Sequence, residues 1–199
     1  VVIPNWVRRF KDENAPSRTT LRQQLGLSPE TILFGSVGRF SPEKAPNDLI
    51  EAFIKAAIPN SHLVLFGAGE MQEALEQQSA DHQDSITLMG YEKNIRPWYQ
   101  TFDVFVLPSR SESFGLVLLE AMDAACPIVT TRSDGAMDLL GENKTVWLAD
   151  IASPNKLAEA LKASAENPFQ RVEYPELANH RLAQASDKIL TFYERFLAK

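Results

Sequence analysis

Short, almost unbroken apolar runs alternate with segments of helical periodicity along most of this sequence, and this alternation limits the fold more than any other feature. Glycine, proline or polar clusters end each run. Strands that are apolar on both faces are typical of a parallel sheet between helices, so we predict a three-layer α/β domain with a mostly parallel sheet of about six strands. The expected strands are residues 32–37, 62–66, 86–89, 103–107, 127–131 and 145–148. The expected helices are residues 17–25, 46–57, 70–78, 95–100, 136–140 and 154–165, with another beginning after Gly115 and a turn at Asp134-Gly135.

The length and the distribution of polar segments favour one main domain with two flanking segments. The 199 residues suffice for a core, and 44% hydrophobic with 23% charged residues are globular proportions. Residues 1–20 have the composition of a linker, residues 21–170 should form the sheet domain, and residues 171–199 should form a C-terminal helix. The apolar face of that helix must cover this domain or a partner domain. It consists of Leu182, Ile189, Leu190, Tyr193, Phe196 and Leu197.

Charge and cysteine usage exclude several classes of protein. The net charge of −6 argues against a broad nucleic-acid surface, which needs a basic face. A single cysteine, Cys126, forms no internal disulfide and should be a small buried apolar residue, and this fits a reducing compartment. No apolar run is long enough to cross a bilayer. The N-terminus lacks an initiator Met and signal-peptide features, so we expect a chain cut from a longer protein.

The three histidines and the acidic residues do not predict a metal site. His62, His82 and His180 are far apart in sequence and lack metal-ligand spacing, so we interpret them as structural or surface residues. No two Asp residues stand one residue apart, a spacing that would clamp a metal-bound diphosphate. The sequence therefore predicts that cations and dipoles of the protein neutralise any phosphate ligand.

Three loops follow expected strands and should meet at one edge of the sheet, where α/β proteins bind ligands. They are residues 38–44, 90–91 and 109–120. In the first, Gly38 allows close backbone approach, and Arg39 with Lys44 supplies two cations that suit a diphosphate. The alternative is that both cations are merely solvated.

The third loop adds backbone donors and two carboxylates. Residues 114–117 should begin a helix whose free N–H groups favour an anion. Glu120 lies further along this helix and should bind a ribose-like diol, although a structural Glu bound to a buried donor would fit the same apolar run. Glu112 precedes the helix and should bind sugar hydroxyls, or else it only stabilises the helix dipole.

A set of motifs in this order resembles the retaining GT-B glycosyltransferases of family 4, also called group 1, over about residues 30–150. The resemblance implies a Rossmann-like domain that forms one half of a GT-B fold and binds a nucleotide-sugar donor. The N-terminal, acceptor-binding domain would then be missing. The motifs are Val37-Gly38-Arg39 with Lys44, Leu65-Phe66-Gly67-Ala68-Gly69, Met89-Gly90, residues 103–109, Glu112-Ser113-Phe114-Gly115 and Glu120-Ala121-Met122.

The resemblance also implies a role for each matching residue. Arg39 and Lys44 would hold the donor diphosphate, Glu120 would bind the ribose, and the loop at Gly90-Tyr91 would border the base. Glu112 and the backbone at Phe114-Gly115 would position the donor sugar. The donor-binding set is Gly38, Arg39, Lys44, Gly90, Tyr91, Ser113, Phe114, Gly115, Leu116 and Glu120, and the catalytic set is Glu112, Arg39 and Lys44.

This family membership would make the chain part of a retaining hexosyltransferase, inactive without its N-terminal domain. No metal or other cofactor is expected. The expected partners are a nucleoside-diphosphate sugar (UDP, GDP or ADP), the missing domain of the same polypeptide and a glycan or lipid acceptor, as in polysaccharide or lipopolysaccharide synthesis. We expect a cytoplasmic protein that reaches the inner face of the membrane only through the missing part. The C-terminal helix would cross back towards the missing domain.

Several residues depart from the family pattern, and two other functions remain open. The alternatives are a non-catalytic nucleotide-binding module and a GT-B-fold epimerase or phosphorylase. Alanine at 45 and 125 and Ser113 replace usual glycines, which narrows backbone freedom near the donor sugar. Asp134-Gly135 replaces a Gly-Gly pair, and Asp138 replaces a Glu.

Overall fold

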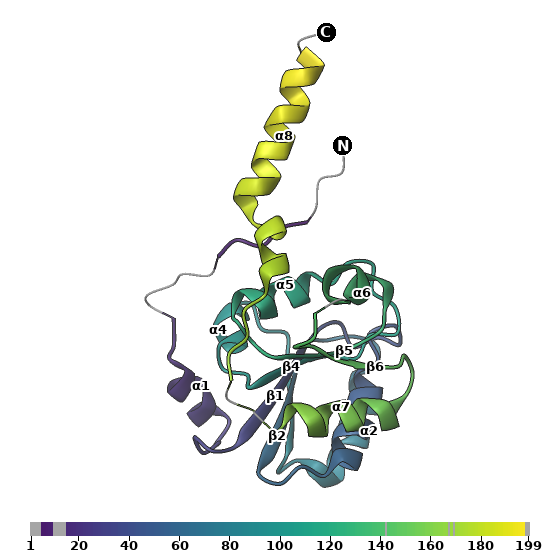
Figure 1. The fold of residues 1–199 in the computed structure, drawn as a ribbon. Coiled ribbons are helices and arrows are strands. Elements are labelled where there is room, and N and C mark those ends of the chain that lie inside the picture. Colours follow the sequence, from purple (N-terminus) through teal and green to yellow (C-terminus); the bar gives the residue numbers. More distant parts are fainter. Residues whose placement is uncertain (1–4, 10–14, 142, 167, 169, 198–199) are drawn as a thin grey trace.

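The computed structural model describes residues 5–9, 15–141, 143–166, 168 and 170–197, and its centre is a six-stranded sheet (Figure 1). Every pair of neighbouring strands is parallel. The order across the sheet is β3-β2-β1-β4-β5-β6. The predicted Rossmann-like α/β fold is therefore confirmed. The strands are β1 Ile32–Val37, β2 Ser61–Phe66, β3 Ile86–Gly90, β4 Val104–Leu107, β5 Ile128–Thr131 and β6 Trp147–Ala149.

Helices cover both faces of the sheet, because successive side chains of each strand point to opposite faces. In β4, Val104 and Val106 join one buried cluster, whereas Phe105 and Leu107 join the other. The first cluster packs on α2 (Pro46–Ala56), α3 (Gln72–Gln78) and α7 (Pro154–Ser164). The second packs on α1 (Arg18–Gln24), α4 (Arg96–Tyr99), α5 (Leu116–Asp123) and α6 (Asp134–Leu140). Short 3-10 helices at Ala80–His82 and Pro175–His180 and the last helix, α8 (Leu182–Leu197), complete the described elements.

Several expected boundaries differ from the structure by one or two residues, and hydrogen bonds explain two of these differences. The turn expected at Asp134-Gly135 is the first turn of α6, where the Gly135 N–H donates to the carbonyl of Glu112 at 2.8 Å. The strand expected at 145–148 begins only at Trp147, because the side chain of Asn143 accepts from the backbone N–H and the hydroxyl of Thr145 and holds it in a turn.

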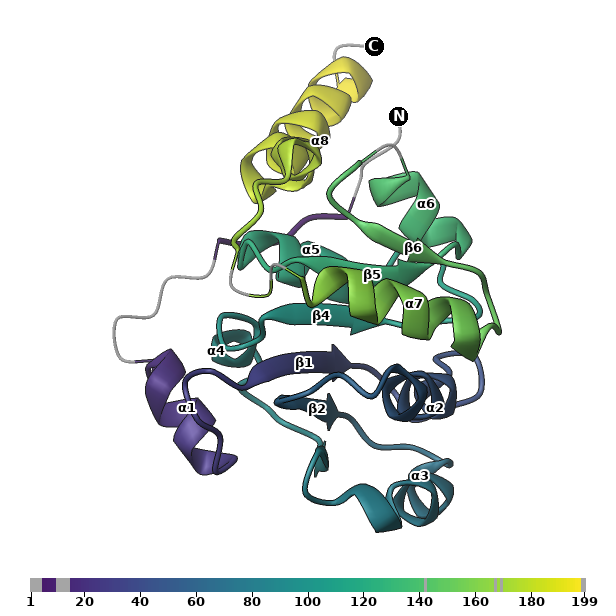
Figure 2. The ribbon, with the colours of Figure 1, turned by 60° about the horizontal axis from the view of Figure 1, so that its bottom comes forward.

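The strand order changes direction between β1 and β4: β2 and β3 are added on one side of β1, and β4, β5 and β6 are added on the other (Figure 2). The loops after β1 and β4 therefore diverge at the carboxyl ends of neighbouring strands, which is where open α/β sheets hold their ligands. The predicted site loops at residues 38–44 and 109–120 follow β1 and β4, so they lie on opposite sides of this switch point.

A segment near the N-terminus of the described chain pairs with the residues just before α8. Val7 forms a parallel bridge with Arg181, and its N–H donates to the carbonyl of His180 at 2.9 Å. From there α8 extends away from the sheet (Figure 1), with Leu190 and Tyr193 more than half exposed. The side chains of Phe196 and Leu197, which belong to the predicted apolar face, lie outside those that the structure describes.

Two of the departures from the family's glycines occupy left-handed backbone conformations. Ala45 has φ 49° and Ala125 has φ 55°, a region that disfavours a side chain. We expect Ala125→Gly to raise the free energy of unfolding by about 0.5–1 kcal/mol, because glycine relieves this strain. Urea denaturation measures it, with Ala124→Gly as the control, since Ala124 has φ −82° and should lose stability. Equal losses in both variants would contradict the strain.

Candidate functional site

Two cavities adjoin at the carboxyl edge of the sheet. The first, which we call the Tyr91 cavity, has a volume of about 400 Å³, and the second, the Phe114 cavity, about 380 Å³. They share the end of β1 as a common wall. The Tyr91 cavity is lined by Val37, Gly38, Arg39, Phe66, Gly67, Ala68, Tyr91, Glu92, Lys93 and Ile95. The Phe114 cavity is lined by Asn5, Val37, Gly38, Arg39, Lys44, Leu107, Glu112, Ser113, Phe114, Gly115, Leu116 and Val117.

Most residues of the predicted site come together in these two cavities. Gly38, Arg39, Lys44, Tyr91, Glu112 and residues 113–116 all line one cavity or both. Gly90 is adjacent to the lining, and its carbonyl accepts the N–H of Gly67 at 2.8 Å. Glu120 lies outside the lining of both cavities. The convergence of the three loops is therefore confirmed, whereas the role of each residue stays a prediction.

Close packing of two glycines shapes the shared wall. A Cβ on Gly67 would lie 1.8 Å from the carbonyl oxygen of Gly38, so only glycine allows the loop after β2 to approach the loop after β1. A Cβ on Gly38 would meet nothing within 4 Å and would project into open space. A ligand can therefore approach the backbone at Gly38 closely.

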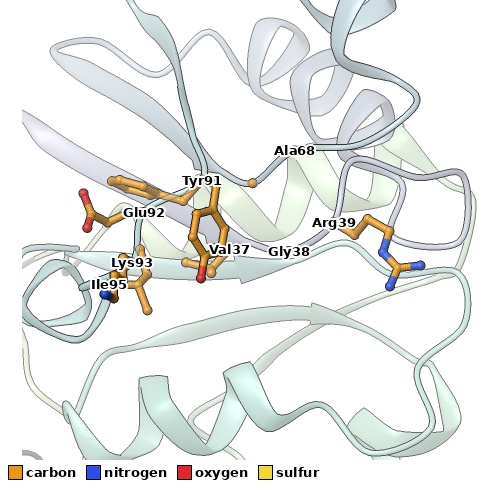
Figure 3. Close-up of a pocket in the computed structure, with 10 residues that line it drawn as sticks. Val37, Gly38, Arg39, Ala68, Tyr91, Glu92, Lys93 and Ile95 are labelled. Atoms are coloured by element: carbon orange, nitrogen blue, oxygen red, sulfur yellow. The ribbon is translucent and has the colours of Figure 1, made fainter.

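The Tyr91 cavity presents an aromatic ring and charged groups at one end. Tyr91, Glu92, Lys93 and Ile95 lie together there, and the side chain of Arg39 extends away from them (Figure 3). Tyr91 is 80% exposed, so its ring is available to a ligand. An exposed aromatic beside polar groups suits a planar base with hydrogen-bonding edges.

The Phe114 cavity presents the beginning of α5 and a cation. Gly115 is the N-cap of α5 and has φ 81°. The first backbone N–H groups of the helix therefore lie at the wall of the Phe114 cavity. Those groups have no intrahelical partner, and the helix dipole favours an anion beside them. Leu116 and Val117 belong to this first turn and line the cavity. Lys44 enters from the loop after β1, so the cavity suits a phosphate group.

Lys44 and Glu112 form an ion pair across this cavity. Lys44 Nζ lies 2.7 Å from Glu112 Oε2, and their side chains are 27% and 12% exposed. Arg39 is exposed and makes no ion pair with the other described residues. A diphosphate would thus meet one cation that already has a partner and one that does not. Its charge would compete with Glu112 for Lys44.

Backbone and side-chain contacts fix the spacing between Lys44 and Glu112. The carbonyl of Glu43 accepts the N–H groups of Arg110, at 2.8 Å, and of Ser111, at 3.2 Å. Arg110 also donates to both carboxylate oxygens of Asp48 in α2, at 3.0 and 2.8 Å. The loops after β1 and β4 therefore hold each other in place, as a preorganised site requires.

The apolar run of α5 predicts a partner for Glu120, and the structure supplies it. The hydroxyl of Tyr99 donates to Glu120 Oε2 at 2.8 Å, and Arg96 Nη1 lies 3.6 Å from Oε1. Burial, and then the negative charge of Glu120, raises the pKa of Tyr99 well above 10.0, so the hydroxyl stays protonated. The Glu120 side chain is still 27% exposed, which leaves part of the carboxylate accessible.

Sequence reasoning missed two residues at the Phe114 cavity. His180 packs against Phe114 with ring centroids 5.5 Å apart, and its Nδ1 lies 2.9 Å from the carbonyl oxygen of Asn5. Asn5 itself lines the cavity. No local pattern could have found them, because the contact between His180 and Asn5 joins residues that are 175 positions apart in the sequence.

Cys126 and His62 are buried, as expected of structural residues. Cys126 is fully buried, and burial raises the pKa of its thiol to about 12. His62 is buried beside Thr87 with Nε2 and Oγ1 2.8 Å apart, and burial lowers the pKa of its imidazole.

Among the residues that the structure describes, no three His, Cys, Asp or Glu side chains are grouped to hold a metal ion. The described helices include none that is long and apolar enough to cross a membrane.

Comparison with known proteins gives a family match over most of the chain. Residues 17–186 match the family described as glycosyl transferases group 1. The lipopolysaccharide core biosynthesis glycosyltransferase LpsE of Rhizobium meliloti is 29% identical over 163 residues, which cover 81% of this chain and 47% of that protein. The UDP-Gal:alpha-D-GlcNAc-diphosphoundecaprenol alpha-1,3-galactosyltransferase of Escherichia coli is 32% identical over 168 residues, which cover 80% of this chain and 43% of that protein. The chain thus spans less than half of each relative.

Solved structures share this fold. HepE of Anabaena, in complex with UDP and glucose, superposes with a TM-score of 0.79 and 22% identity, over 89% of this chain and 52% of that chain. At this level of identity the likeness extends to the fold. The GT-B half predicted from the sequence motifs is therefore confirmed as an architecture.

Proposed function

The chain belongs to the group 1 glycosyl transferases, and we propose that it is the donor-substrate domain of an enzyme that transfers a sugar from a nucleoside-diphosphate sugar to a glycan or lipid-linked acceptor. One observation carries the proposal. Two adjoining cavities at the switch point of the sheet share Gly38 and Arg39, and the second adds Lys44 and the first turn of α5. This is the shape and charge that a base linked to a diphosphate requires.

The donor would extend across both cavities. The base would lie in the Tyr91 cavity, and the diphosphate and sugar in the Phe114 cavity. The complex of the Anabaena protein with UDP and glucose supports a nucleotide sugar as the class of ligand. The epimerase, phosphorylase and non-catalytic alternatives are not favoured, since the matching family and relatives are sugar transferases.

The reaction we propose retains the configuration of the sugar. The bond between the sugar and the diphosphate breaks, the acceptor oxygen bonds to the same carbon from the same face, and the acceptor proton passes to the departing diphosphate. Arg39, Lys44 and the α5 N–H groups would stabilise the charge on the leaving group, and Glu112 would orient the sugar. These groups supply the electrostatic stabilisation without a metal.

Acceptor contacts belong, in this proposal, to a further domain of the same polypeptide. The chain spans less than half of the two relatives described above, so we expect donor binding without transfer from it alone. The proposed location is the cytoplasm. Any contact with the inner face of the membrane would come from the rest of the protein.

Titration of the chain with UDP, GDP and ADP and their sugar derivatives tests the donor site. We expect Lys44→Ala to lower the affinity for the nucleotide that binds most tightly by roughly 10- to 100-fold, because a charge-assisted contact to phosphate is lost. Glu120→Gln should weaken it roughly 3- to 10-fold. Calorimetry measures both affinities. Lys156→Ala is the control, since Lys156 pairs with Glu159 on the solvent-exposed face of α7 and lines neither cavity.

Each outcome of this titration bears on a different part of the proposal. Unchanged affinity in both variants would overturn the assignment of the site residues. Failure of the unaltered chain to bind any of the three nucleotides would overturn the proposed function itself.

A further inference from the structure

Glu120 has neighbours that contribute to both cavities. On α5, Val117 precedes it by three residues, the spacing of one helical face, and Val117 lines the Phe114 cavity. On the other side, Arg96 lies 3.6 Å from Glu120 and follows Ile95, which lines the Tyr91 cavity. In a nucleoside diphosphate the ribose connects the base to the phosphates. The carboxylate therefore stands where a ribose would pass if the donor extends across both cavities.

The buried hydroxyl of Tyr99 makes the short hydrogen bond to this carboxylate. Tyr99 is fully buried, and its ring packs on Phe102 and Phe105 with centroids 5.7 and 5.3 Å away. This close packing limits the movement of the phenol ring and therefore of its hydroxyl. The hydroxyl donates to Glu120 Oε2. The raised pKa of Tyr99 keeps the proton on this oxygen, which makes Tyr99 a donor at every physiological pH.

The hydrogen bond occupies only part of the capacity of the carboxylate. An ionised carboxylate has about four acceptor positions, of which Tyr99 takes one. Arg96 is too distant, at 3.6 Å, to take another with good geometry. Oε1 and the second lone pair of Oε2 remain for two adjacent hydroxyl groups. A pair of neighbouring hydroxyls is what a ribose offers and a deoxyribose lacks.

We propose that Tyr99 is a positioning residue that holds the Glu120 carboxylate in the orientation that binds the two ribose hydroxyls of the donor. Tyr99 acts through Glu120 and does not touch the ligand. The inference rests on the proposed function, since it assumes that the nucleotide lies across both cavities. It assigns to a residue of α4, outside the lining of either cavity, the selection of ribonucleotides over deoxyribonucleotides.

The test compares ribose and dideoxyribose ligands in matched variants. UDP, GDP and ADP are titrated into the 199-residue chain, each beside its dideoxy form, which lacks both ribose hydroxyls. Tyr99→Phe should weaken the ribonucleotide roughly 3- to 10-fold, about the effect of one lost hydrogen bond, and leave the affinity for the dideoxy form unchanged. Glu120→Gln should remove the preference for ribose. Adding Tyr99→Phe to Glu120→Gln should cause no further loss.

Tyr174→Phe is the matched control for the loss of a buried hydroxyl. Tyr174 is buried, and its hydroxyl donates to the carbonyl of Cys126 at 2.7 Å, away from both cavities. This variant should lower the melting temperature without changing any nucleotide affinity. A purely structural role for Tyr99 would give the same result as this control.

Several other results would also overturn the inference, and they are distinguishable. If Tyr99→Phe weakens the ribose and dideoxy forms equally, or if its effect persists in full beside Glu120→Gln, Tyr99 does not act through Glu120 on the ribose. If Tyr99→Phe does not fold, Glu120→Gln alone decides, since an unchanged preference for ribose excludes Glu120 from ribose binding. If the unaltered chain binds none of the three nucleotides, the proposed function falls, and the inference falls with it.

Discussion

Replacing Asp103 with alanine is expected to lower the free energy of unfolding by about 3–5 kcal/mol, because the substitution breaks a buried ion pair and leaves one charge without its partner. Asp103 stands just before β4, with 2% of its surface exposed. Its carboxylate accepts the backbone N–H of Leu33 at 2.8 Å and the guanidinium of Arg22 at 3.1 Å, and it also pairs with Arg18. It thereby joins α1 to the first strands on either side of the switch point.

The size of the effect follows from what the substitution would leave behind. Arg22 is 3% exposed, and burial lowers the pKa of its guanidinium while the Asp103 carboxylate opposes that shift. A guanidinium does not give up its proton in this range, so without Asp103 a positive charge would remain buried with only carbonyl partners. The N–H of Leu33 would lose its acceptor as well.

Chemical denaturation and calorimetry measure this loss. For a chain of this length we expect the melting temperature to fall by roughly 6–20 °C. Asp150→Ala is the control, because Asp150 is exposed and lies 3.7 Å from the exposed Arg132. Its removal should change stability by less than about 0.5 kcal/mol. Similar small losses in both variants would show that α1 is not held to the sheet through Asp103.

The strands were predictable because a strand that is buried on both faces has apolar residues at nearly every position. Phe105 and Leu107 pack on one layer of helices and Val104 and Val106 on the other, so β4 had to be apolar throughout. The same rule placed the predicted loops at one edge, since parallel strands end together. The predicted boundaries were wrong where a hydrogen bond to a side chain or to another loop determines where an element begins, as the bond from Thr145 to Asn143 does before β6.

The site was predictable in its location and only partly in its contacts. The apolar surroundings of Glu120 indicated that it needs a partner, but the sequence could not name Tyr99, which lies on another helix. The pairing of Lys44 with Glu112 was missed for the same reason, since each was assigned to a different part of the ligand. Side-chain partners across loops depend on the packing of the sheet, which sequence periodicity does not specify.

Replacing Gly135 with alanine is expected to disturb the donor site from outside the two cavities. Gly135 is the second residue of α6, and a Cβ there would lie 2.6 Å from the backbone nitrogen of Phe114 and 2.7 Å from the carbonyl oxygen of Glu112. Backbone atoms cannot move aside as a flexible side chain can. Either α6 or the loop at 112–114 must therefore shift, and the hydrogen bond from Gly135 to Glu112 must lengthen.

We expect Gly135→Ala to lower stability by about 1–3 kcal/mol, as overpacking does, and to weaken nucleotide-sugar binding roughly 10-fold or more. Gly38→Ala is the informative comparison, because a Cβ on Gly38 would meet nothing within 4 Å. That methyl group should leave stability within about 0.5 kcal/mol of its original value but occupy space that the ligand needs. Denaturation and calorimetric titration of both variants therefore distinguish two roles. Gly135→Ala should lower both stability and affinity, because Gly135 supports the loop at 112–114, whereas Gly38→Ala should lower affinity alone, because Gly38 lies at the cavity wall. Retention of full nucleotide-sugar affinity by Gly135→Ala would mean that Glu112 and Phe114 bind the donor less closely than their place in the cavity requires.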